Sequence, residues 1–274
     1  MTTTLSAPVT TRPQTLARAI HAEWIKTRSL RSTWIGMAAV AVVMIGFGAI
    51  ASAVSAGTVA APGRGGGPFA GGGALSTVLT GSTFAVLLIG VLGSLAGARE
   101  YGSRMITASV VAVPRRWQVV VAKAVALSAA VIPTALVAVM GSYAAGTAIL
   151  SANDAPTVAL TDDGVLTTLV GMVGYITAIA LIGLGLGILL RSVAGSIGAV
   201  VGGILILPNI AGALLPDSWD TILRFLPNSA ASAFTAVAAA GDTKLGTVAG
   251  VAVLAIWVAA ALVAAVVSLS RRDV

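Results

Sequence analysis

VLTTLVGMVGYITAIALIGLGLGILL, residues 165–190, contains no charged side chain and no proline. A helix with so few polar positions belongs either in the core of a large protein or in a membrane. A hydrocarbon core roughly 30 Å thick is crossed by about 20 helical residues at 1.5 Å each. The stretch is therefore long enough to cross a bilayer as a single helix.

The composition of the whole chain favours the membrane. Of its 274 residues 57% are hydrophobic and only 9% are charged, too few charges to cover a soluble globular surface. The net charge of +7 is not spread over a basic groove with stacking aromatics, so we expect no nucleic-acid partner. Attraction to the anionic headgroups of the lipid bilayer explains it more simply.

Five further stretches resemble residues 165–190. We predict an all-α polytopic membrane protein with six transmembrane helices and a cytoplasmic N-terminal interfacial helix. Pro208 and Asn209 make the fifth span the least regular, so it is a candidate for a broken or re-entrant segment. The expected spans are residues 34–56, 76–98, 124–150, 165–190, 194–215 and 245–269 of a transmembrane domain over 33–270.

The distribution of positive charge predicts the orientation. Of the 16 Lys and Arg residues, only Arg64, Arg224 and Lys244 fall outside the termini and the alternate connections that would share their side. Because short cytoplasmic loops retain Lys and Arg, we expect both termini in the cytoplasm. Residues 1–14 and 271–274 would be cytoplasmic tails, the first of them disordered.

The segment before the first span, residues 15–32, has good helix formers and no Gly or Pro. Leu16, Ile20 and Trp24 share one face, which predicts an interfacial helix anchored by Trp24 and Lys26, with Arg28 on the same segment. A solvated helical extension of the first span is the alternative.

The densest polar cluster follows the second span. A topological signal needs positive charge alone and would explain neither Glu100 nor the aromatic residues. One interpretation is that Arg99 pairs locally with Glu100 while the rest binds lipid headgroups; the other is a docking surface for a soluble partner. The candidate docking residues are Arg99, Glu100, Tyr101, Gly102, Arg104, Arg115 and Arg116.

The sequence lacks the residues that several kinds of catalytic and binding site require. Without cysteine there is no disulfide, thiolate metal site or cysteine nucleophile, and no phosphate-binding Gly-x-x-x-x-Gly-Lys-Ser/Thr motif occurs. His21, the only histidine, lies before the first span, and none of the six spans has a clearly central ionisable residue. We therefore expect no enzyme, no bound metal and no cofactor.

Glycines are frequent in the fourth and fifth spans. Small residues let helices approach closely, so we expect these positions to be packing contacts. They are Gly183, Gly185, Gly187, Gly195, Gly198, Gly202 and Gly203.

Short motifs in a shared order resemble the ABC-2 type permease subunits of ATP-binding-cassette exporters. They are EWIKTR at 23–28, EYGSRMIT at 100–107, PRR at 114–116 before Ala122-Lys123, and LPN at 226–228. The second is similar to the family's Glu-aromatic-x-x-Gly-Thr-Ile pattern but departs from it at residues 104–107. The resemblance covers nearly the whole chain.

The resemblance implies a permease of the bacterial cytoplasmic membrane that pairs with a second permease subunit and with separate ABC ATPase subunits, which bind the ATP. Residues 99–117 would include the segment that receives the ATPase motion, beside the interfacial helix. Hydrophobic or amphipathic export cargo is the expectation. A nucleotide-independent secondary transporter or channel-like protein is the alternative, and a membrane enzyme or scaffold ranks below both.

Overall fold

The computed structural model describes residues 15–59, 73–102, 116–235 and 245–271, and within these ranges the chain is helical and has no strand. Five helices are long and apolar enough to cross a membrane. This confirms the all-α class for the described residues and gives five candidate membrane-spanning helices, whereas six spans were predicted. They are α2 (Arg31–Ser55), α4 (Ser82–Gly102), α6 (Arg116–Ala152), α7 (Val165–Leu190) and α12 (Thr247–Arg271).

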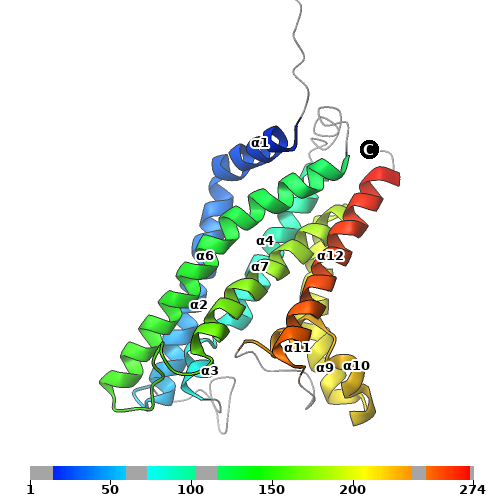
Figure 1. Cartoon of the computed structure of the whole chain (residues 1–274). Coiled ribbons are helices and arrows are strands. Elements are labelled where there is room, and N and C mark those ends of the chain that lie inside the picture. Colours follow the sequence, from blue (N-terminus) through cyan, green and yellow to red (C-terminus); the bar gives the residue numbers. More distant parts are fainter. Residues whose placement is uncertain (1–14, 60–72, 103–115, 236–244, 272–274) are drawn as a thin grey trace, which may run out of the picture.

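The long helices run up and down in an elongated bundle (Figure 1). Helix α7 is the most enclosed, because 67% of the residues in its apolar stretch are buried inside the bundle. Helix α12 is the least enclosed, with 17%. Side chains such as Leu136, Ile256 and Val263 are more than half exposed on the outside of the bundle. A helical bundle with this apolar exterior suits lipid as its solvent.

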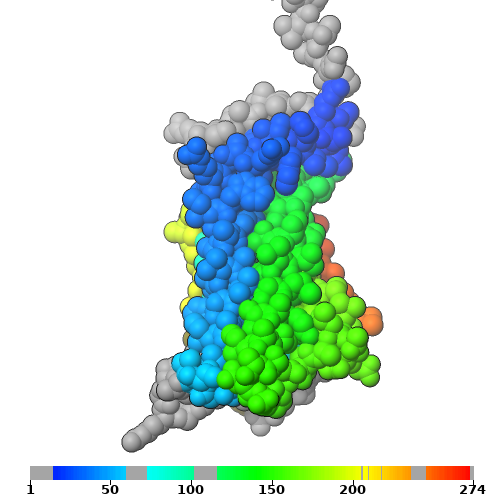
Figure 2. All heavy atoms as spheres, turned by 90° about the vertical axis from the view of Figure 1, so that its left-hand side faces the viewer, coloured from blue at the N-terminus to red at the C-terminus, as the bar shows by residue number. Residues whose placement is uncertain are grey.

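Helix α1 (Leu16–Ser29) is separated from α2 by one non-helical residue. Leu30 has an extended backbone with φ −84° and ψ 102°, so the helical hydrogen bonds break there and α2 begins at Arg31. Figure 2 shows α1 lying across the ends of α2 and α6. Trp24 is partly buried against the core, and Ala19 and Glu23 are buried.

Two of the long helices begin at residues other than the starts of the expected spans. The second begins at Ser82, because residues 76–78 belong to a short helix, α3 (Ala74–Val78), and a turn follows. Gly81 in that turn packs against the backbone carbonyl of Met44, where a side chain would not fit. The third begins at Arg116. The apolar run was expected to begin at 124 because Lys123 interrupts it, but the helix continues through Lys123.

The fifth expected span is composite. It consists of α8 (Val193–Val201), a π-helical turn (Gly202–Ile206, η1) and α9 (Leu207–Leu214), of nine, five and eight residues. The Leu207 N–H donates to the Gly202 carbonyl five residues back, immediately before Pro208. A proline ring collides with the carbonyl four residues earlier, and the wider π turn relieves that collision. The irregularity expected from Pro208 therefore lies in the turn immediately before it.

Helices α4 and α7 cross at close range through glycines on both helices. A Cβ at Gly93 would collide with the Ala180 carbonyl of α7, and one at Gly183 with the Gly90 carbonyl of α4. Gly185 and Gly187 also contact backbone, of α12 and α4, so the packing prediction is confirmed for these three α7 glycines. It is wrong within this chain for Gly198, Gly202 and Gly203, which face open space, while Gly195 meets only the Ser192 side chain.

Short helices close the end of the bundle away from α1. They are η2 (Asp217–Trp219), α10 (Asp220–Leu223) and α11 (Pro227–Ala231). Tyr175 of α7 donates a hydrogen bond to the Asn228 side-chain oxygen at 3.1 Å, and Trp257 of α12 donates to the Phe225 carbonyl at 2.8 Å. These two hydrogen bonds hold the segment around Phe225 and Asn228 against α12 and α7.

Candidate functional site

All Lys and Arg residues that the structure describes, except Arg224, lie at one end of the bundle. Helix α1, the start of α2, the end of α4, the start of α6 and the end of α12 all lie there (Figure 1). We call it the charged end. It holds Arg18, Lys26, Arg28, Arg31, Arg99, Arg116, Lys123, Arg191 and Arg271. Asp154, Asp162, Asp163 and Asp220 lie at the other end, which matches the charge asymmetry read from the sequence.

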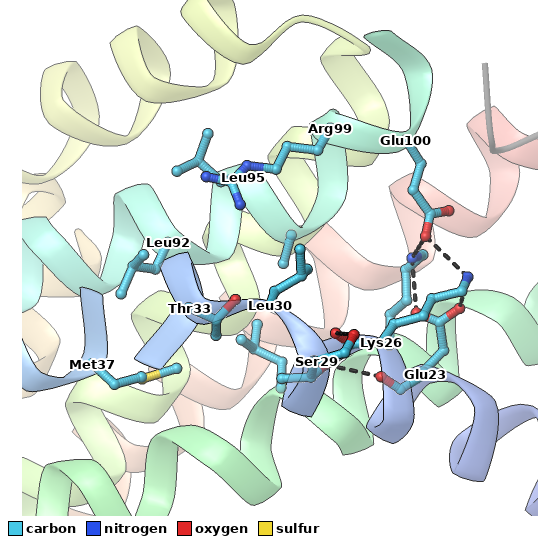
Figure 3. Close-up of a pocket in the computed structure, with 14 residues that line it drawn as sticks. Glu23, Lys26, Ser29, Leu30, Thr33, Met37, Leu92, Leu95, Arg99 and Glu100 are labelled. Carbon is cyan, nitrogen blue, oxygen red and sulfur yellow. Dashed lines mark hydrogen bonds and ion pairs between the residues drawn. The ribbon is translucent and has the colours of Figure 1, made fainter. Parts of the chain in front are cut away.

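Four of the side chains at the charged end form an ion cluster, Glu23, Lys26, Glu100 and Lys123. The Lys123 Nζ lies 2.6 Å from Glu100 Oε1 and 2.9 Å from Glu23 Oε2. The Lys26 Nζ lies 2.7 Å from Glu23 Oε1 and 3.1 Å from Glu100 Oε1. Each carboxylate thus contacts both ammonium groups, and the two charges of each sign balance (Figure 3).

The ion cluster is largely withdrawn from solvent. The Lys123 side chain is 6% exposed, and those of Glu23 and Glu100 are 12% and 13% exposed. Lys26 is more open at 36%. Burial alone would lower the pKa of Lys26, but the hydrogen bonds and negative charges of Glu23 and Glu100 outweigh it and raise that pKa.

Three consecutive residues at the end of α4 contact different neighbours, because successive helix positions point about 100° apart. Arg99 donates to Ser32 Oγ of α2 at 3.3 Å, and Glu100 joins α1 and α6 through the ion cluster. Tyr101 presents its ring to Arg191, whose guanidinium carbon lies 5.1 Å from the ring centroid at the end of α7. We call Arg99, Glu100 and Tyr101 the α4 junction.

Two arginines connect α6 and the end of α7 to α12. Arg116 donates to the Leu269 carbonyl at 2.6 Å, and Arg191 donates to the Ser268 carbonyl at 3.4 Å. Cations at these carbonyls also complement the negative end of the α12 dipole. The end of α4 is thereby linked, directly or through one residue, to α1, α2, α6, α7 and α12.

A cavity of about 320 Å³ lies beside the ion cluster, between α1, α2, α4 and α6. Figure 3 shows Arg99 and Glu100 on its α4 side and Leu30, Thr33 and Met37 on its α1–α2 side. Its wall is charged toward the end of the bundle and apolar further in, so it suits an amphipathic molecule.

The structure brings together some of the candidate residues and does not cover others. Arg99, Glu100, Tyr101 and Arg116 lie together at the charged end, and Gly102 is the last residue of α4. Arg104 and Arg115 lie outside the described residues. The predicted local pair of Arg99 with Glu100 does not occur among the described residues. Glu100 forms ion pairs with Lys26 and Lys123 instead. Lys26 likewise points into the ion cluster, while Arg28 is exposed.

Glu23 and Lys123 belong to the site but were not among the predicted site residues. A signal was available, because Glu23 and Glu100 are rare acids on the side rich in Lys and Arg. Acids that stay at such a place within an apolar bundle need cationic partners. Lys123 was assigned to the loop before the third span, so its side chain was not expected to be buried.

Among the described residues, no group of three or more His, Cys, Asp or Glu side chains could hold a metal ion. Comparison of the chain with protein-family models and with curated protein sequences finds no match.

Proposed function

We propose that this chain is the membrane-spanning permease subunit of an ATP-binding-cassette exporter, driven by a separate ATPase subunit that docks at the charged end. The observation that carries the proposal is the α4 junction. A displacement of the connection that follows α4 would reach α1, α2, α6 and α7 through Arg99, Glu100 and Tyr101. A force applied at one short segment would thus be passed to most of the bundle.

The proposal includes the finer topology. The stretch from α8 to α9 would be the sixth crossing, both termini would lie in the bacterial cytoplasm, and α1 would lie on the inner leaflet as the interfacial helix. A second permease subunit would cover the α8 face, where a Cβ at Gly198, Gly202 or Gly203 would meet nothing within 4 Å. Open glycines at helical spacing suit a close helix–helix contact between subunits.

The ion cluster favours this function over ion-coupled transport. Its four charges balance one another at the end of the bundle, whereas coupling sites for protons or ions usually lie deep in the membrane beside a pathway. In our proposal the cluster joins three elements and the ATPase supplies the energy. The chain itself would bind no nucleotide, and hydrophobic or amphipathic molecules would be its cargo.

The test is reconstitution of the complex purified from native membranes into lipid vesicles. We expect an ATPase subunit to co-purify and cargo movement to require hydrolysable ATP. Arg115→Glu should release the ATPase subunit, and Lys244→Glu, an equal charge reversal that the sequence assigns to the opposite side, should not. Transport at the same rate without nucleotide would refute the proposal, and retention of the ATPase by Arg115→Glu would refute the docking site.

A further inference from the structure

The cavity beside the ion cluster changes in character from its rim to its floor. Arg99, Ser29 and Leu30 at the rim are exposed, whereas Met37 and Leu127 on the floor are only 2% and 4% exposed. Leu92 of α4 also lines the apolar part, on the same side of Figure 3 as Met37. A ligand that fills this cavity has to be polar at one end and apolar at the other.

The charge at the rim selects the sign of the polar end. Glu23, Lys26, Glu100 and Lys123 line the cavity but neutralise one another within the ion cluster. Arg99 adds a further positive charge, so the formal charges of the described lining residues sum to +1. Ser29 and Thr33 add hydroxyl groups nearby. A guanidinium with hydroxyl groups beside it is suited to the oxygens of a phosphate.

The level of the cavity in the bundle is that of a lipid headgroup. Trp34 and Trp117 are 45% and 43% exposed at this end, and exposed tryptophans of membrane proteins concentrate at the boundary between hydrocarbon and water. Thr33, which precedes Trp34 in α2, and Met37, one turn further along the helix, both line the cavity. The cavity therefore extends from this boundary toward the hydrocarbon. At about 320 Å³ it is at the small end of ligand pockets and would enclose a headgroup and the upper part of one chain.

We propose that this cavity is a binding site for one anionic phospholipid, with the phosphate at Arg99 and an acyl chain along Met37 and Leu92. The lipid would fill the angle between α1 and α2 at Leu30, where the two helices separate. The site needs no ATPase partner, so it can be tested on the full-length chain alone, and its failure would leave the proposed transport function untouched.

The experiment is a lipid titration of the delipidated full-length chain in detergent, followed by native mass spectrometry. We expect the first phosphatidylglycerol to bind about fivefold more tightly than the first phosphatidylcholine, the effect of one basic residue near a membrane surface. Arg99→Gln should abolish this preference. Ala96→Phe, which places a ring in the cavity, should weaken the first binding event for both lipids.

Arg271→Gln is the matched control, because Arg271 lies at the same end of the bundle and does not line the cavity. It should keep the fivefold preference, and thermal unfolding of each variant should show that all are folded. An equal preference in Arg99→Gln and wild type would overturn the proposal. Competition by inorganic phosphate as strong as that by phosphatidylglycerol would also overturn it, since it would indicate a simple anion site.

Discussion

Lys123 lies about two turns into α6, at a depth where a lone ammonium group would be costly. Its partners come from elsewhere in the chain, Glu23 from α1 and Glu100 from α4. Two carboxylates that share two cations satisfy one another only while all four are present. The ion cluster is therefore sensitive to the loss of any one of its members.

The first prediction concerns the charge balance of the ion cluster. Lys123→Met leaves the ion cluster with two carboxylates and one ammonium group, and we expect it to destabilise the purified chain by about 3 kcal/mol, as for removal of one partner of a buried ion pair. Adding Glu100→Gln restores the balance of one cation to one anion, so the double variant should recover part of the loss. Thermal unfolding in detergent measures both.

Arg271→Met is the control for that experiment, because it removes one cation at the same end from an exposed position. It should change the unfolding midpoint little. A double variant that is less stable than Lys123→Met by the full effect of Glu100→Gln alone would show that the two residues act independently, contrary to the shared cluster.

The second prediction concerns pH and Lys26. Its pKa is raised above the ordinary value of 10.5 by Glu23 and Glu100 despite its burial, so the folded state holds this proton more tightly than the unfolded state. The stability from Lys26 is fully present below pH 10.5 and is lost as the pH rises through the folded-state pKa. The free energy of unfolding of wild type should exceed that of Lys26→Gln by at most about 1 kcal/mol, because the Lys26 side chain is 36% exposed and solvent screens its charge.

That difference between wild type and Lys26→Gln, measured by thermal unfolding, should stay constant from pH 7 to 9 and shrink only above about pH 10.5. A difference that grew with pH in that upper range would reverse the sign of the interaction and contradict the assigned pairing.

At the scale of elements, the contact between α4 and α7 organises the bundle. Apolar burial contributes little to helix association in lipid, so close packing and hydrogen bonds have to hold the helices together. Gly93 and Gly183 let the two backbones approach each other, with no room for a Cβ. The third prediction concerns this contact.

We expect Gly93→Ala to destabilise the chain by about 1–3 kcal/mol, because its methyl group would meet the Ala180 backbone, which cannot move aside as a side chain can. Gly174→Ala on α7 is the matched control, since a Cβ there meets nothing within 4 Å. It should leave stability unchanged or raise it slightly through helix propensity. Equal effects of the two substitutions on thermal unfolding would show that the crossing is not tightly packed.

At the scale of the whole molecule, the arrangement of the helices places α1 and the connection between α6 and α7 at opposite ends (Figure 1). The chain has no cysteine, so single cysteines can be introduced without removing native ones. Ser29 and Thr161 are both exposed, one at each end. They are suitable positions for labelling.

The fourth prediction is that Ser29→Cys reacts with a membrane-impermeant maleimide only in inverted vesicles and Thr161→Cys only in intact cells. The physical reason is that Lys and Arg are retained on the cytoplasmic side, where the charged end would lie. Reversed labelling would overturn the orientation. Labelling of both positions from one side would overturn the arrangement of membrane-crossing helices.

The sequence was sufficient to identify the long helices, because an apolar run of spanning length is a property of neighbouring residues. It was less reliable at their ends. Lys123 was read as a boundary although the helix continues through it, and residues 76–78 were read as part of a span although Gly81 introduces a turn. A charge can lie inside a helix when another element supplies its counterion, and local sequence does not show that element.

The sequence by itself determined that this chain is built of apolar helices and that most of its basic residues fall in the termini and alternate connections, since length, hydropathy and charge are all local. The tertiary structure decided that Glu100 pairs with Lys26 and Lys123 rather than with Arg99, its neighbour in sequence. It also decided which glycines are in contact and where a cavity lies. These depend on distances between residues as far apart as 23 and 123, which only the packing of the helices sets.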